Sequence, residues 1–178
     1  MKKYKLVLNC GSSSLKFALY ENDGKKIALG NFEKIGINYS VEGIGNAIVK
    51  ADEIHINSIF SNIILNAKDA LEELGGEGKE IRVTVEGKNN EDSSYFIIKV
   101  SDNGPGIPED HLNEIFEPFF STKPTSGTGL GLGIVKRLVQ LYGGEIVVES
   151  KEGEGAIFTV TLPCNILATD PHRNTQTF

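Results

Sequence analysis

The feature that most constrains this 178-residue chain is a run of apolar residues at helical spacing. The run consists of Ile54, Ile56, Ile59, Phe60, Ile63, Ile64, Ala67 and Leu71. This period gathers them on one face of a helix, with polar residues interleaved. Gly75 and Gly76 then end the run, as glycines commonly end helices. We therefore expect a long amphipathic helix whose apolar face packs against another layer of structure.

Segments typical of strands lie on both sides of this helix. They span residues 4–9, 15–20, 26–32, 81–85, 95–100, 145–150 and 156–162. Alternating apolar residues bounded by turn residues predict strands, and the polar stretch 86–94 predicts a hairpin loop. Helical spacing returns over 132–141, and residues 115–120 read as a short apolar helix or turn.

The net charge, the length of the apolar runs and the cysteine spacing each argue against a class of function. The net charge of −6 makes the surface repel nucleic acid and anionic lipid. The apolar runs are far shorter than the roughly 18 residues that span a bilayer, so we expect a soluble, cytoplasmic chain. The two cysteines, Cys10 and Cys164, lack CxxC spacing, which argues against a zinc site and a disulfide framework.

Asn62 and Asn66 are four residues apart and therefore share one face of the predicted helix. Buried amides need polar partners, and a metal ion or a phosphate would supply one. The alternative is that both amides bond nearby backbone groups.

Asp102 follows a predicted strand and precedes Gly104 and Gly106. A carboxylate there can accept a hydrogen bond from an exocyclic amine, and the glycines allow a flat ring to approach the backbone. An ordinary Asp-Asn-Gly turn is the alternative.

Three spaced glycines precede the second predicted helix. The segment reads Gly127, Thr128, Gly129, Leu130, Gly131 and Leu132. Free N–H groups at a helix start suit a triphosphate, although a flexible loop has the same composition. The spacing is not that of a P-loop, because no Gly-Lys-Ser/Thr follows.

These motifs stand in order along the chain, with Phe116 to Phe120 between the second and the third. Together they resemble the N, G1, F and G2 boxes of histidine-kinase ATPase domains, a family that shares its fold with gyrase, the heat-shock chaperone and the mismatch-repair ATPases. The resemblance covers residues 35 to 163. It implies that ATP and Mg²⁺ are the ligands.

The resemblance also implies a role for each matching residue. Asn66 looks like the Mg²⁺-coordinating amide, Asp102 like the adenine-reading carboxylate, and Gly104 and Gly106 like the G1 glycines. Gly127 to Gly131 would form the hinge and phosphate clamp of a mobile lid. Lys123 is placed to reach a terminal phosphate, or it is a solvated loop lysine. Hydrolysing relatives carry a Glu at the position of Asn62, and an amide cannot act as a base, so ATP should be held rather than hydrolysed.

The N-terminal segment has a second resemblance. Residues 6–16, Leu-Val-Leu-Asn-Cys-Gly-Ser-Ser-Ser-Leu-Lys, are similar to the opening phosphate-binding strand and turn of acetate kinases, and the likeness extends weakly to Gly36. That family needs several hundred further residues for activity. We therefore expect a β element that packs against the ATPase sheet or replaces its first strand, in a natural fusion or an engineered chimera.

None of the three histidines fits a phosphoacceptor, which the resemblance places before an acidic residue. Ile56 follows His55, Leu112 follows His111, and His172 lies in the tail. The leading hypothesis is a Mg-ATP-binding histidine-kinase domain that acts on a His of another polypeptide, with a response regulator as a further partner. Alternatives are a fusion that only binds nucleotide and an acyl-phosphate kinase.

These expectations combine into an α/β two-layer sandwich, in which a mixed, mainly antiparallel sheet carries helices on one face. The predicted parts are an N-terminal β segment over residues 1–36, the ATP-binding domain over 37–163, and an irregular tail over 164–178.

Overall fold

The fold rests on one long helix, α1 (Glu53–Glu72), in the computed structural model of the chain. The structure describes residues 3–10, 14–21, 26–33, 37–42, 47–72, 74, 77–89, 94–122 and 128–166. The Asp52 carboxylate caps α1 by accepting the Ile54 N–H at 2.8 Å. The predicted apolar face is buried, but Ile54 is 75% exposed, because it lies in the first turn and faces outward.

A five-stranded sheet packs against this helix. Its order is β8 (Glu145–Lys151), β9 (Gly155–Ile166), β7 (Ser94–Asp102), β6 (Lys79–Asn89) and β4 (Ile37–Glu42). All neighbours are antiparallel except β4 and β6, which are parallel. Alternate residues such as Phe96, Ile98 and Val100 point into the core, as the two-residue period of a strand requires.

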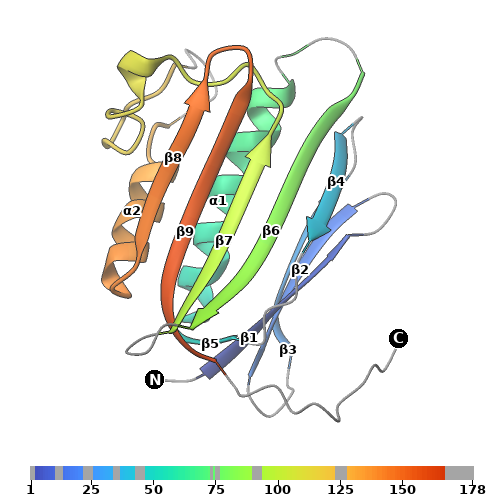
Figure 1. Cartoon of the computed structure of the whole chain (residues 1–178), viewed down its shortest axis with the longest axis vertical. Coiled ribbons are helices and arrows are strands. Elements are labelled where there is room, and N and C mark those ends of the chain that lie inside the picture. The colour runs from blue at the N-terminus through green and yellow to red at the C-terminus, as the bar shows by residue number, and fades with distance from the viewer. Residues whose placement is uncertain are drawn as a thin grey trace.

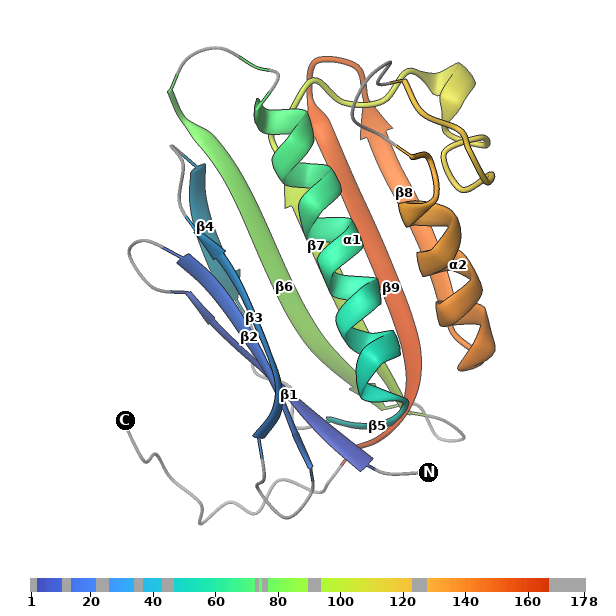
Figure 2. The ribbon, with the colours of Figure 1, turned by 180° about the vertical axis from the view of Figure 1, so that it is seen from behind.

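Both long helices lie on one face of this sheet (Figures 1 and 2). The second helix, α2 (Gly131–Leu141), buries Val135 and Val139. The opposite face carries no helix among the described residues (Figure 1). The predicted two-layer α/β architecture, with a mixed and mainly antiparallel sheet, is thus confirmed. Within the described residues, we find no helix that combines the length and the apolar character needed to cross a bilayer.

The N-terminal segment forms an antiparallel meander of β1 (Lys3–Cys10), β2 (Ser14–Glu21) and β3 (Lys26–Glu33). β1 pairs with a short strand, β5 (Ala47–Lys50), and β5 pairs with the end of β9. The meander therefore extends the sheet through β5 and leaves β4 in place beside β6, so it does not replace an edge strand.

Several elements differ from the sequence-based expectation. No strand was expected at β4 or β5, and β6 continues to Asn89, where it pairs with Ser94. β9 continues to Ile166, past the residue at which an irregular tail was expected, because Cys164 pairs with Ser94 and Ile166 with Ala47. Residues 115–120 form turns, and a 3₁₀ turn spans Glu109–His111.

Candidate functional site

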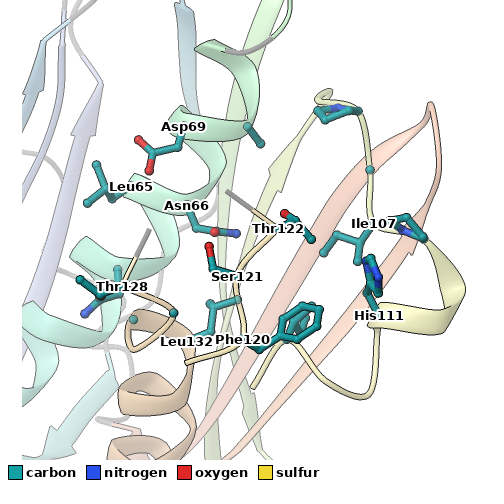
Figure 3. Close-up of a pocket in the computed structure, with 18 residues that line it drawn as sticks. Leu65, Asn66, Asp69, Ile107, His111, Phe120, Ser121, Thr122, Thr128 and Leu132 are labelled. Atoms are coloured by element: carbon teal, nitrogen blue, oxygen red, sulfur yellow. The ribbon is translucent and has the colours of Figure 1, made fainter. Parts of the chain in front are cut away.

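A cleft of about 290 Å³ lies between α1, the loop after β7 and the start of α2 (Figure 3). The α1 wall consists of Asn62, Leu65, Asn66, Asp69 and Ala70. The loop after β7 supplies Pro105, Gly106, Ile107, Pro108, His111 and Ile115. The remaining lining residues are Phe120, Ser121, Thr122, Thr128, Gly129, Gly131 and Leu132. The three motifs that contain Asn66, Gly106 and Gly129 therefore meet at this cleft. Phe120, the last residue of the Phe116–Phe120 motif, also lines it.

Two of the asparagines on α1, Asn62 and Asn66, are used differently. The Asn62 amide nitrogen donates to the Ser58 carbonyl at 2.8 Å and contacts the Ser58 hydroxyl at 3.2 Å. A Cβ atom at Gly131 would lie 2.8 Å from the Asn62 Oδ1 atom, so this asparagine packs closely against the start of α2. No such bond ties the Asn66 amide to another described residue, and Figure 3 shows it turned into the cleft.

Asp102 lies at the end of β7 and is half-buried. Its carboxylate accepts the Gly104 N–H at 2.9 Å. Burial raises the pKa of this carboxyl, and hydrogen bonds from the backbone of Gly104 and Ala156 oppose that rise. A Cβ atom at Gly104 would lie 2.6 Å from Asp102 Oδ1 and 3.5 Å from Ala70 Cβ. The carboxylate is thus next to the Ala70 end of the cleft, behind Gly104, although neither Asp102 nor Gly104 lines the cleft itself.

Asn103, the middle residue of the Asp-Asn-Gly turn, fixes this loop to the neighbouring strand. Its amide nitrogen donates to the Gly78 carbonyl at 2.7 Å, and its amide oxygen accepts the Glu80 N–H at 2.7 Å. The Asn103 N–H also donates to the Glu80 carbonyl at 3.3 Å. The turn is therefore part of the site's framework, and Asp102 is held in place before any ligand arrives.

The helix α2 begins at the opposite end of the cleft. Its N-cap residue, Leu130, makes no side-chain cap, and its first turn contains no acidic residue. Gly131 and Leu132, whose N–H groups belong to that first turn, line the cleft. The positive end of the helix dipole is therefore directed at the cleft, and no acidic residue of that first turn offsets it.

A backbone hydrogen bond connects the F-box and G2-box motifs beside the cleft. The Phe119 N–H donates to the Gly129 carbonyl at 2.9 Å. Phe119 adopts a φ of 68°, a left-handed value that is rare for a bulky residue, and its side chain is 78% exposed. Lys123 and Gly127 fall outside the described residues, and Leu130 is exposed without lining the cleft.

Some lining residues were not expected from the sequence. Asp69 lies three residues after Asn66, so helical spacing alone was enough to place it on the same face. His111 and Phe120 come from irregular chain and meet ring edge to ring face, with centroids 5.3 Å apart. Their position depends on tertiary packing, for which the sequence carries no periodic signal. Among the described lining residues, Asp69 and His111 are the ionisable ones.

Comparisons with known proteins bear on this arrangement. Residues 51–166 match the family described as histidine kinase-, DNA gyrase B- and HSP90-like ATPases. The sensor histidine kinase ZraS of Escherichia coli strain K12 is 41% identical over 123 residues, which are 69% of this chain and 24% of that protein. The chain thus spans about a quarter of the length of the curated relatives it matches.

Solved structures agree with the sequence relatives. The mycobacterial sensor histidine kinase MprB superposes with a TM-score of 0.60 at 26% identity, covering 74% of this chain and 85% of that one. Full-length ShkA in complex with AMPPNP gives a TM-score of 0.56 at 30% identity, covering 75% of this chain and 26% of that one. This chain therefore belongs to the histidine kinase-, DNA gyrase B- and HSP90-like ATPase family, and it carries an ATP-binding catalytic domain of the histidine-kinase type.

Proposed function

We propose that the chain binds Mg-ATP in this cleft and transfers the terminal phosphate to a histidine on a separate domain. The observation that carries the proposal is the meeting of Asn66, the loop at Gly106 and the start of α2 at Gly131 around one cleft. The ShkA structure, which holds the ATP analogue AMPPNP, supports the choice of nucleotide.

Adenine would lie at the Asp102 end. The Asp102 carboxylate accepts backbone hydrogen bonds and keeps acceptor capacity for the exocyclic amine of adenine, because an ionised carboxylate has about four lone-pair sites. Ala70, Pro105 and Ile107 offer apolar contact for the ring at this end. A purine whose exocyclic group is a carbonyl would place two acceptors face to face and bind more weakly.

Mg²⁺ and the phosphates would lie between Asn66 and the start of α2. A free amide oxygen is a hard ligand that suits Mg²⁺, so the residues present fit the ion. The Asp69 carboxylate on the same wall would repel an uncompensated triphosphate, and a bound Mg²⁺ offsets that charge. The uncapped start of α2 would hold phosphate oxygens through its backbone N–H groups.

The cleft is suited to holding ATP rather than hydrolysing it. An amide cannot take a proton from water, and the Asn62 nitrogen is already bonded to the Ser58 carbonyl. Transfer to another nucleophile is then the productive fate of the terminal phosphate.

The acceptor histidine is proposed to lie on another domain, because neither described histidine is followed by an acidic residue. His55 Nδ1 is 2.7 Å from the Tyr142 hydroxyl, and that hydroxyl also accepts the Asp52 N–H at 2.8 Å. His111 lies in the cleft wall, and its buried Nδ1 atom has no hydrogen-bond partner in the part of the chain that the structure describes. A response regulator would be the subsequent partner. We further propose that residues 1–36 are an acetate-kinase-like β segment fused to the ATP-binding domain.

Calorimetric titration with AMPPNP, in Mg²⁺ and in EDTA, tests the binding. We expect micromolar affinity in Mg²⁺. A folded chain that bound no nucleotide would contradict the proposal.

Incubation with radiolabelled ATP and a purified histidine-containing acceptor domain from a related kinase tests the transfer. We expect label on the acceptor that is stable to base and labile to acid, with an acceptor whose histidine is replaced by alanine as control. Tight binding without transfer would favour the second hypothesis, a module that binds nucleotide only.

A further inference from the structure

The turn between β8 and β9 lies against the loop that follows β7 (Figure 1). This turn contains none of the sequence motifs, and no residue from it lines the cleft. It nevertheless contacts the backbone of the segment that forms the cleft wall from Pro105 to Pro108.

Ser150, the residue before the last of β8, makes the central contact. Its hydroxyl oxygen accepts the Ile107 N–H at 2.9 Å, and its O–H donates to the Gly155 carbonyl at 2.6 Å. One hydroxyl thus uses both its acceptor and its donor capacity to join the cleft wall to the β8–β9 turn. A second bond runs parallel to it, from the Gly153 N–H to the Pro105 carbonyl at 2.7 Å.

The two backbones approach as closely as glycine allows. Gly106 has a φ of 72°, and a Cβ atom there would lie 2.1 Å from the Lys151 carbonyl oxygen. Only a residue without a side chain fits between this loop and the turn. The turn therefore limits where this part of the loop can lie, and Ser150 supplies a side-chain bond that holds the two together.

The residue type at position 150 also departs from the pattern of its strand. Alternate residues of β8 face the helices, and the preceding inward positions are the apolar residues Ile146 and Val148. Ser150 continues that series with a hydroxyl. The hydroxyl at this inward position does more than fill the core. It accepts the Ile107 N–H, which would lose this partner if the hydroxyl were removed.

We propose that Ser150 is a positioning residue for nucleotide binding: its hydroxyl holds the cleft wall at Ile107 in the conformation that receives the ligand. This inference rests on the proposed Mg-ATP function of the cleft. Ser150 acts through Ile107 and does not touch the nucleotide itself.

The test compares Ser150→Ala, Ser150→Thr and the parent chain. We expect Ser150→Ala to weaken AMPPNP binding about tenfold in Mg²⁺, the scale of one lost hydrogen bond to a half-buried group. Ser150→Thr, which keeps the hydroxyl, should recover the parent affinity to within about twofold. The Ile107 amide of the nucleotide-free Ser150→Ala chain should exchange with deuterium faster than in the parent.

Thr161→Ala is the matched control, because Thr161 carries a hydroxyl on β9 at the far end of the same strand pair, opposite Glu145. Its affinity should equal that of the parent. Parent-like affinity and Ile107 exchange in Ser150→Ala would overturn the proposal, as would equal weakening by Ala and Thr. A parent chain that bound no nucleotide would instead overturn the proposed function, and the two failures are therefore distinguishable.

Discussion

The two ends of the cleft are built in different ways. At the Asp102 end, the polar groups are already bonded to backbone: Asp102 to Gly104, Asn103 to Gly78 and Glu80, and Ser150 to Ile107. At the Asn66 end, the amide of Asn66 has no hydrogen bond to another described residue, and the N-cap of α2 makes no side-chain cap. The first end is preorganised, whereas under the proposed function the second would be completed by its ligands. Substitutions at the first end should therefore change affinity whether or not Mg²⁺ is present, and those at the second should change the dependence on Mg²⁺.

Asp102→Asn should have the largest effect on binding. An amide presents a donor where the proposal places the exocyclic amine of adenine, so AMPPNP affinity should fall about 100-fold or more. The ratio of affinities in Mg²⁺ and in EDTA should stay as in the parent, because the change is at the preorganised end. Calorimetry in both buffers measures the ratio, and unchanged affinity would exclude Asp102 as the base-reading group.

The same variant should change the pH dependence of stability. Burial raises the pKa of Asp102 in the folded chain above its ordinary value of 3.8. Between the two values the folded state binds more protons than the unfolded state, so this carboxyl's contribution to the free energy of unfolding falls as pH rises. Urea unfolding at a series of pH values upward from 3.8 should show a fall in the parent that is reduced in Asp102→Asn. If the free energy of unfolding fell equally with pH in the parent and in Asp102→Asn, the raised pKa of Asp102 would be contradicted.

Asn66→Ala should come next and act at the other end. Loss of the amide oxygen should weaken binding about tenfold in Mg²⁺ and leave binding in EDTA nearly unchanged, because the proposed role of Asn66 is to hold the ion. Asn57→Ala is a suitable control, since Asn57 is also on α1 and contacts Ser61 at 3.3 Å, away from the cleft. If Asn66→Ala weakened binding equally in both buffers, Asn66 would not hold the cation. The two ends of the cleft would then not differ in their dependence on Mg²⁺.

Some parts of the fold and of the candidate site could be predicted from the sequence, and others could not. Helix α1 and the strands β7 and β9 were predictable because burial imposes a local period on their residues. The same period placed Asn62 and Asn66 together. Short strands such as β4 could not be predicted, since its pairing with β6 joins residues about 40 positions apart and leaves little local pattern.

The site was predictable where a motif stands in one element and obscure where two elements meet. The bond from Ile107 to Ser150 and the contact of His111 with Phe120 depend on how loops pack. Neither contact has a characteristic spacing in the sequence. The different uses of Asn62 and Asn66 were equally hidden, because the two share a residue type and a helix face and differ only in their neighbours.

Gly131→Ala should have a smaller effect, about threefold to fivefold in affinity. A Cβ atom at this position would lie 2.8 Å from Asn62 Oδ1, so either the Asn62 side chain or the start of α2 must move to accommodate it. Asn62→Ala makes room for the methyl group. In the double variant the two effects should therefore sum to less than their separate values, and strict additivity would show that the contact does not couple the helices.

Tyr142→Phe should leave AMPPNP affinity within about twofold of the parent. This result would show that the effects expected at the two ends of the cleft are local. The Tyr142 hydroxyl joins the end of α2 to Asp52 and His55 at the start of α1, whereas the cleft is formed by the later turns of α1. Loss of this hydroxyl should lower the free energy of unfolding by about 1 kcal/mol, measured by urea titration. If the loss of this distant hydroxyl also weakened AMPPNP binding tenfold, affinity would depend on the overall packing of α1 against α2. The effects assigned to the two ends of the cleft could then not be attributed to local contacts.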